Sequence, residues 1–221
     1  MSDPSIQLVS YTQQNYFLTS HTPIGSEKEI WLILHGYGQL AEYFLRKFRR
    51  FFDPSLLFVA PEGINRSYRE GFSGRVGANW MTKHQRETDI TNGMNYLNAV
   101  MENVLKPFDE KPEINVLGFS QGAATVSRWV VQSPFPIEKM VLWGGTLAVD
   151  LDKEKLLEKA KNLHLILATG DNDPLITPDK INEHLDNVGT FAFRKLSAFT
   201  YAGGHDLDER LLHQIILAGQ G

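Results

Sequence analysis

Several features are missing from this sequence, and each absence excludes a class of protein or site. None of the 221 residues is cysteine, which excludes disulfides, a thiolate nucleophile and cysteine-ligated zinc or iron–sulfur sites. No apolar run approaches the roughly 18 to 20 residues that cross a bilayer. Residues 1–4 lack the basic and apolar stretches of a secretion signal. We therefore expect a cytoplasmic protein with no membrane span.

An excess of positive charge is also missing. The chain has 22 Lys and Arg against 26 Asp and Glu, a formal net charge of -4 with a pI near 6.0. Proteins that bind nucleic acid or anionic membranes through their overall charge are usually basic, so we expect neither partner. The length suits one sizeable core, and we predict a single domain over residues 1–221.

The most informative stretch that is present covers residues 114–131. Residues 114–117 are apolar and predict a strand, and residues 121–131 predict a helix that ends before Pro134. Between them, Gly-Phe-Ser-Gln-Gly at 118–122 fits G-x-S-x-G, a tight strand-to-helix turn that projects the serine hydroxyl above the sheet. The flanking glycines are needed because the two backbones pass too closely to leave room for side chains.

Strands and helices alternate along the rest of the chain. Apolar runs predict further strands at residues 29–34, 56–60, 140–143, 163–169 and 191–199. Helical spacing predicts helices at residues 40–52, 85–105, 153–161, 178–187 and 207–217. Two short runs at residues 8–12 and 16–19 predict an edge hairpin. The alternation predicts an α/β fold with a mostly parallel central sheet and helices on both faces.

A serine hydroxyl reacts only if a base takes its proton and a carboxylate orients that base. In folds with this turn, the acid and then the histidine follow on loops after later strands. The strand at 163–169 runs into Gly-Asp-Asn-Asp-Pro at 170–174, and the last strand runs into Ala-Gly-Gly-His-Asp at 202–206. The sequence thus supplies Asp171 or Asp173 as the acid and His205 as the base.

Four motifs in this order resemble the phospholipase/carboxylesterase family of α/β-hydrolases. They are Leu-His-Gly-Tyr-Gly at 34–38, Gly-Phe-Ser-Gln-Gly at 118–122, Gly-Asp-Asn-Asp-Pro at 170–174 and Gly-Gly-His at 203–205. The family includes small carboxylesterases and acyl-protein thioesterases, and the resemblance covers most of the chain from residue 30 onward. It implies an α/β-hydrolase fold. The interval between residues 143 and 163 has room for one short helix, so we expect no large lid.

The resemblance also implies roles for individual residues. Ser120 is the expected nucleophile, His205 the general base and acid, and Asp173 the orienting carboxylate, since the family acid lies three residues after the glycine and before proline. Asp171 is then a turn residue that bonds nearby backbone amides. The backbone N–H of Gln121, directly after the nucleophile, is one expected oxyanion donor. By resemblance, the second donor is the N–H of Tyr37.

Substrate contacts are expected from three side chains, Trp80, Phe119 and Leu175. Trp80 lies in the polar segment 62–83, which we expect to set specificity. Asn79-Trp80 resembles the tryptophan segment that borders the acyl site in relatives, but Met81-Thr82 replaces the usual aromatic and aspartate.

The basic residues Arg66, Arg69 and Arg75 of segment 62–83 are interpreted as a solvated loop. A binding site for an acidic leaving group is the alternative. His35 is expected to be structural, because the family His-Gly shapes the oxyanion loop. The remaining histidines lack paired ligand spacing, so we expect no metal and no cofactor.

These observations predict a serine carboxylesterase that hydrolyses small to medium acyl esters through an acyl-enzyme. An acyl (protein) thioesterase or a lysophospholipase with the same triad is the nearest alternative, because the triad does not distinguish oxygen from sulfur leaving groups. A non-enzymatic binding protein of the same fold is a third. The expected partner is a small-molecule acyl ester, and the protein could be a monomer or a homodimer.

Overall fold

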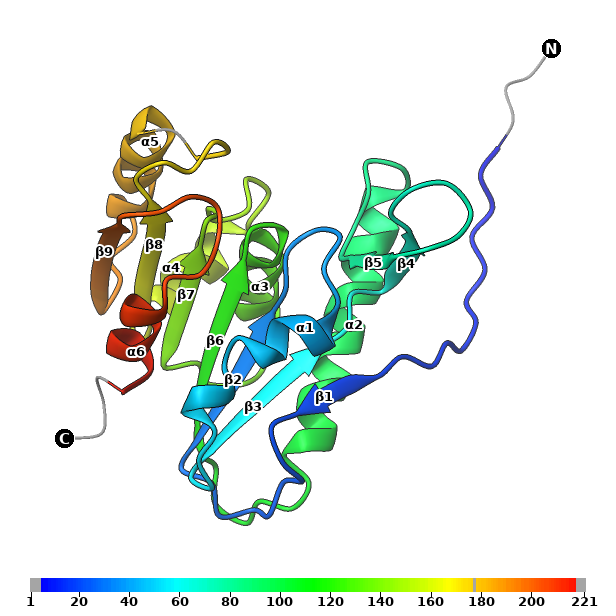
Figure 1. The fold of residues 1–221 in the computed structure, drawn as a ribbon, viewed down its shortest axis with the longest axis horizontal. Coiled ribbons are helices and arrows are strands. Elements are labelled where there is room, and N and C mark those ends of the chain that lie inside the picture. Colours follow the sequence, from blue (N-terminus) through cyan, green and yellow to red (C-terminus); the bar gives the residue numbers. More distant parts are fainter. Residues whose placement is uncertain (1–4, 177, 218–221) are drawn as a thin grey trace.

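The structure is a computed structural model that describes residues 5–176 and 178–217. Its centre is a seven-stranded sheet with strand order β1-β3-β2-β6-β7-β8-β9 (Figure 1). The strands are β1 (Phe17–Thr19), β2 (Glu29–Leu34), β3 (Leu56–Pro61), β6 (Glu113–Phe119), β7 (Lys139–Trp143), β8 (His164–Gly170) and β9 (Lys195–Tyr201). The helices are α1 (Ala41–Arg46), α2 (Arg86–Val104), α3 (Gln121–Gln132), α4 (Lys153–Ala160), α5 (Pro178–Gly189) and α6 (Glu209–Leu217).

All neighbouring strands of this sheet are parallel except β1, which pairs antiparallel with β3. The predicted α/β class with a mostly parallel sheet is thus confirmed. The chain leaves β2 toward β3 on one side, while β6 lies on the other side of β2. Loops that diverge from adjacent strands in this way open a crevice at the carboxyl ends of the strands, where α/β proteins bind ligands.

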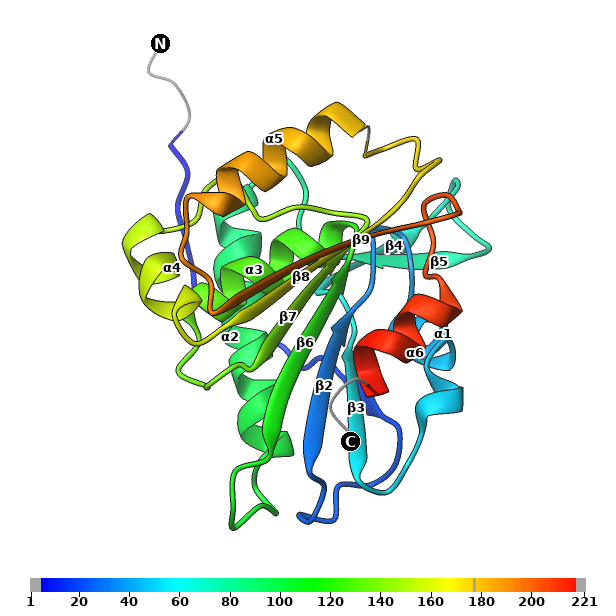
Figure 2. The ribbon, with the colours of Figure 1, turned by 90° about the vertical axis from the view of Figure 1, so that its left-hand side faces the viewer.

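The strand β2 shows how the sheet is buried on both faces. Ile30, Leu32 and Leu34 join the core cluster that contains side chains of α2 and α3. Trp31 and Ile33 join a second cluster with side chains of α1 and α6. Figure 2 shows the same division, with α1 and α6 on one face and α2 to α5 on the other. A continuous apolar run therefore marks this strand, because alternate side chains enter two cores.

The structure corrects three element predictions. Residues 8–12 form no strand, and Leu8 and Val9 are exposed, so the edge hairpin is reduced to β1 paired with the edge of β3. The helix expected at 40–52 divides into α1 and a 3-10 turn, η1 (Arg49–Phe51), because Phe48 leaves helical geometry and packs on Phe58. The last strand begins at Lys195 rather than 191.

The polar segment 62–83 forms a separate antiparallel hairpin of β4 (Asn65–Tyr68) and β5 (Val76–Asn79). Its β5 strand bonds to the loop after β2, where the N–H of Gly38 donates to the carbonyl of Ala78 at 2.8 Å. A Cβ built on Gly77 would lie 2.6 Å from the carbonyl oxygen of Gly38. The hairpin is therefore packed directly on the loop that carries Tyr37.

Candidate active site

Ser120 lies in the tight turn between β6 and α3. Its backbone has φ 54° and ψ -117°, a conformation that strains any residue with a side chain. Its N–H donates to the carbonyl of Trp143 at 2.8 Å, which fixes the turn against β7. A Cβ on Gly118 would lie 2.3 Å from the Gly122 carbonyl, and one on Gly122 would lie 2.4 Å from the Leu34 carbonyl. These approaches are the physical reason for both glycines of the motif.

The structure brings together the serine, histidine and aspartate that the sequence singles out. The Oγ of Ser120 lies 2.9 Å from Nε2 of His205, and Nδ1 of His205 lies 2.7 Å from Oδ2 of Asp173. The Asp173 side chain is fully buried, whereas that of His205 is 19% exposed. The other carboxylate oxygen of Asp173 accepts the N–H groups of Leu175 and Ile176 at 2.8 and 3.2 Å. The carboxylate therefore has a single orientation, facing the imidazole.

Asp171 has a different environment. It is exposed, and its Oδ1 accepts the backbone N–H of Gly203 at 2.9 Å and the side-chain amide of Asn172 at 2.8 Å. These bonds tie the loop after β8 to the loop after β9. Asp171 thus bonds a backbone amide near the histidine loop, while Asp173 bonds the histidine itself.

The imidazole of His205 is enclosed by an aromatic ring and a glycine. The ring of Phe119 lies 4.9 Å from it, centre to centre, and the ring of Phe44 lies 6.2 Å beyond. A Cβ on Gly144, which has φ 55°, would lie 3.1 Å from Cε1 of His205. Phe119 is only 4% exposed, so its visible role is to support the imidazole. Its predicted contact with a substrate stays a prediction.

The loop after β2 brings a second set of backbone amides to Ser120. A Cβ on Gly36 would lie 3.2 Å from Cβ of Ser120, so this loop passes directly beside the serine. Gln39 closes the loop, because its Oε1 accepts the N–H of Gly36 at 2.8 Å. Within the described residues, the backbone N–H groups of Tyr37 and Gln121 have no acceptor. Both donors are free to bind an oxyanion.

His35 holds the start of this loop from inside the protein. Its Nδ1–H donates to the carbonyl of Gly36 at 2.8 Å, and its Nε2 accepts the N–H of Gly63 at 2.9 Å. Burial lowers the pKa of His35 to about 4, outweighing the opposite effect of the Gly36 carbonyl. The ring is neutral near pH 7 and joins the loops after β2 and β3, in keeping with a structural role.

Trp80 is buried at 2% exposure, and its indole N–H donates to the carbonyl of His35 at 2.9 Å. Its predicted contact with a substrate stays a prediction, since little of its surface is accessible. Leu175 differs, with 55% of its surface exposed beside the Asp173 loop.

The side-chain contacts of Gln121 and the role of Glu62, which both support the site, were not predicted from the sequence. The side-chain amide of Gln121 accepts the N–H of Trp80 and donates to the carbonyl of Met81, at 2.9 and 2.8 Å. Glu62 is fully buried and accepts the N–H of Ala41 at 2.6 Å, which fixes the start of α1. A carboxylate directly after a buried strand was the available signal for Glu62.

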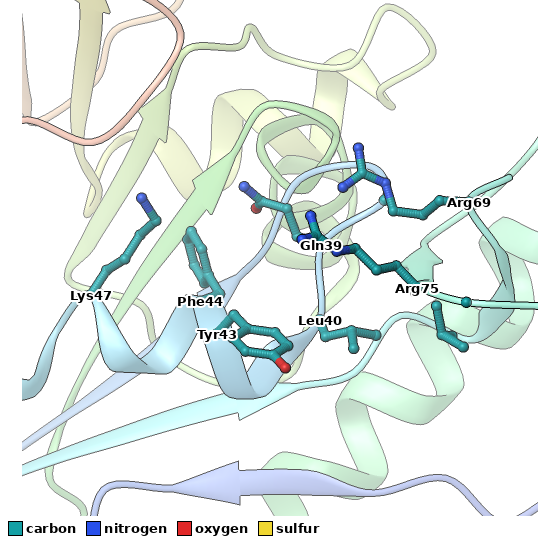
Figure 3. A pocket seen from close by; sticks show the side chains of 10 residues that line it. Gln39, Leu40, Tyr43, Phe44, Lys47, Arg69 and Arg75 are labelled. Atoms are coloured by element: carbon teal, nitrogen blue, oxygen red, sulfur yellow. The ribbon is translucent and has the colours of Figure 1, made fainter.

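Two cavities lie beside loops that carry parts of the site, although neither is lined by Ser120 or His205. One of about 610 Å³ lies between the loop after β2, α1 and the β4–β5 hairpin (Figure 3). The other, of about 550 Å³, lies beside the loop after β7 and the Asp173 loop, and much of its lining is apolar, including Leu147, Val149, Leu175 and Phe191. Gly145 directly precedes Thr146 in the lining of this second cavity. A Cβ at Gly145 would lie 2.8 Å from the carbonyl oxygen of Ser120, so the two backbones pass closely here.

Within residues 5–176 and 178–217, no group of three or more His, Cys, Asp or Glu side chains is placed to hold a metal ion. In the same part of the chain, no helix has both the length and the apolar character to cross a bilayer.

Comparison with known families agrees with this geometry. A model of the phospholipase/carboxylesterase family matches residues 20–217. The chain belongs to this family. Membership makes it a hydrolase of the esterase and thioesterase group, as the four motifs predicted. Comparison with curated proteins gives no match.

Solved structures carry the same fold as this phospholipase/carboxylesterase-family chain at low sequence identity. The acyl-protein thioesterase 2 of Zea mays has a TM-score of 0.70 and 19% identity, over 94% of this chain and 100% of that one. The carboxylesterase of Bacillus cereus has a TM-score of 0.68 and 16% identity, over 91% of each chain. The carboxylesterase of Mesorhizobium loti has a TM-score of 0.67 and 19% identity, over 87% of this chain and 90% of that one.

Proposed function

We propose that the protein is a serine carboxylesterase in which Ser120 is the nucleophile, His205 the general base and acid, and Asp173 the carboxylate that orients His205. The observation that carries the proposal is the continuous hydrogen-bonded series from Ser120 Oγ through both nitrogens of His205 to the buried carboxylate. Because Asp173 accepts from Nδ1–H, the neutral ring presents an unprotonated Nε2 to the serine hydroxyl.

The reaction then follows from these groups. Ser120 Oγ attacks the ester carbon while its proton passes to Nε2 of His205, and the carbonyl oxygen becomes an oxyanion beside the N–H groups of Tyr37 and Gln121. One such donor is typically worth about 10² to 10³ in turnover. The tetrahedral intermediate collapses, the alcohol leaves with the proton from His205, and the acyl group stays on Ser120. Water then attacks the acyl-enzyme with His205 as base and releases the acid.

The cavity lined by Leu147 and Leu175 is our choice for the acyl chain, since its lining residue Thr146 directly follows Gly145, which packs closely on the backbone of Ser120. An apolar acyl chain of small to medium length gains affinity there by leaving water. The same groups would hydrolyse a thioester, because the oxyanion is identical and the sulfur leaving group needs less help from His205.

Two measurements test this proposal. A fluorophosphonate probe should label the wild type at Ser120 and leave Ser120→Ala unlabelled. A panel of matched p-nitrophenyl esters and acyl thioesters, with acyl chains from two to twelve carbons, should then show ester hydrolysis with an optimum at small to medium length. Labelling at another residue, or the absence of both labelling and turnover, would contradict the serine-esterase assignment and favour a binding protein.

A further inference from the structure

The cavity of about 610 Å³ beside the loop after β2 has an unusual lining (Figure 3). Its walls include the apolar side chains of Leu40, Tyr43 and Phe44, and three cationic side chains also line it, those of Lys47, Arg69 and Arg75. In Figure 3 the two arginines enter from the hairpin, and Lys47 enters from the side of α1. No acidic side chain of the described residues lines the cavity.

The two arginines carry charge that the protein leaves uncompensated. Among the described residues, neither Arg69 nor Arg75 has a carboxylate within ion-pair distance, whereas Lys47 pairs with Asp206 at 2.7 Å. Among the other described arginines, Arg46 pairs with Glu42, whereas the exposed Arg49 and Arg66 have no carboxylate within ion-pair distance and do not line the cavity. Two like charges at one cavity repel each other unless an anion lies between them, and a guanidinium is suited to bind the oxygens of a carboxylate or phosphate.

The cavity is not lined by Ser120 or His205, but it is connected to the reacting groups through two of its lining residues. Gly38, in its wall, directly follows Tyr37, the proposed oxyanion donor. Phe44 in the wall contacts Phe119, whose ring packs on His205. A group that leaves from Ser120 must come within reach of His205 to receive its proton, so this side of the histidine is a natural exit for the leaving half of a substrate.

The hairpin holds its arginines in a defined position relative to the loop after β2. The backbone N–H of Arg69 donates to the carbonyl of Arg75 at 2.8 Å, which aligns the two arginines across the hairpin. Farther along β5, the carbonyl of Ala78 accepts the N–H of Gly38. The backbone of Gly77 passes so close to Gly38 that only a glycine fits at position 77. The backbone that carries the two arginines is thus hydrogen-bonded to the loop that contains Tyr37.

We propose that this cavity binds an anionic oxygen group, a carboxylate or a phosphate, on the leaving half of the ester substrate, with Arg69 and Arg75 as its main partners. The proposal rests on the proposed esterase function and narrows it. The apolar acyl chain occupies the cavity beside Leu175, and the charged alcohol half occupies the cavity beside Arg69. The preferred substrates are therefore acyl esters of hydroxy acids or of phosphorylated alcohols.

Matched substrates test the proposal. The probes are 3-carboxyphenyl butyrate and 3-phosphonooxyphenyl butyrate, with 3-carbamoylphenyl butyrate as the uncharged control. Phenyl hydrogen glutarate and its carboxamide move the same charge to the acyl half. Each kcat/KM is measured in the wild type, in Arg69→Gln/Arg75→Gln, and in Arg49→Gln/Arg66→Gln, which removes equal charge from exposed positions that do not line the cavity.

We expect the Arg69→Gln/Arg75→Gln variant to lose about tenfold or more in kcat/KM for the charged leaving groups, and to stay within about twofold for the carbamoyl ester. The Arg49→Gln/Arg66→Gln variant should keep the wild-type ratio of charged to uncharged substrate. Whichever of the carboxylate or phosphate ester loses more identifies the preferred anion. The proposal fails if both variants lose equally, if charged and uncharged esters fall together, or if only the charged acyl half is affected.

The experiment distinguishes a wrong subsite proposal from a wrong esterase proposal. If the wild type hydrolyses the carbamoyl ester and Ser120→Ala does not, the function stands and the ratios above decide the subsite. If no ester is hydrolysed, titration calorimetry of 3-carboxyphenyl butyrate into the wild type and into Arg69→Gln/Arg75→Gln decides it by binding alone. Equal binding to both proteins would then reject the subsite.

Discussion

The tight turn at Ser120 and the tip of the β4–β5 hairpin both contain glycines, but for opposite reasons. At the elbow, a Cβ on Gly118 or Gly122 would lie within 2.3 to 2.4 Å of a backbone oxygen. At the hairpin tip, Gly71 and Gly74 have nothing within 4 Å and need only their positive φ angles. The turn at Ser120 is thus determined by backbone packing against the core, whereas the tip of the hairpin presents exposed side chains that can vary without disturbing the fold.

The largest expected effect is on kcat, and it comes from comparing one substitution, serine to alanine, in the two regions. Ser120→Ala removes the hydroxyl that forms the acyl-enzyme and should lower kcat for a short-chain p-nitrophenyl ester by about 10⁶-fold. Ser73→Ala makes the same chemical change at the exposed hairpin tip and should leave kcat unchanged. Steady-state kinetics and circular dichroism of both variants make the test. Activity near wild type in Ser120→Ala would reject the nucleophile.

The next effect compares two aspartates in one loop. Asp173→Asn should lower kcat by about 10⁴-fold, because an amide stabilises the wrong tautomer of His205. Asp171→Asn keeps an oxygen that can accept the N–H of Gly203, so its loss should be less than about tenfold. The reverse ranking of kcat would mean that the orienting carboxylate is Asp171.

A third prediction concerns backbone packing alone. Gly122→Ala forces a methyl group against the Leu34 carbonyl and should lower the free energy of unfolding by about 3 kcal/mol. Gly93→Ala, in α2 with open space around it, should be neutral or stabilising by up to about 1 kcal/mol. Urea unfolding of the two variants gives both values. If Gly122→Ala and Gly93→Ala have equal free energies of unfolding, the backbone around position 122 can shift to accommodate a methyl group.

The smallest effect is a dependence of stability on pH. Burial holds the pKa of His35 at about 4 in the folded protein, below its ordinary value near 6.5. Between these values the unfolded chain binds more protons, so the free energy of unfolding falls as the pH drops. His35 should account for about 2 kcal/mol of this fall between pH 7 and pH 5.

His35→Gln should therefore flatten the stability curve in that window and leave its slope above pH 7 unchanged. Urea unfolding at half-unit pH steps measures this. An unchanged slope between pH 7 and pH 5 would mean that the ring is charged in the folded protein, contrary to its two backbone bonds.

Most of the fold could be predicted because its strands are buried on both faces. Residues 30–34 are apolar without interruption and residues 163–169 are mostly apolar, and such runs leave few structures other than a covered parallel strand. Residues 8–12 carry a similar local pattern and form no strand, since pairing needs an available sheet edge, and only β1 lies on that of β3. The family was predicted from four short motifs, each of which has a local backbone or chemical reason.

The sequence by itself determined the tight turn at Ser120 and the chain order of the serine, aspartate and histidine, and through the family resemblance it predicted Asp173 as the acid. Each of these depends on neighbouring residues or on chain order. Only the tertiary structure decided what Trp80, Gln121, Arg69 and Arg75 contact, because their partners lie on other loops of the carboxyl edge. Trp80, whose contact with a substrate stays a prediction, donates its indole N–H to the carbonyl of His35. Arg69 and Arg75, interpreted from the sequence as part of a solvated loop, are exposed and also line a cavity beside the loop after β2. Local pattern cannot encode such contacts, since they arise only when distant segments pack together.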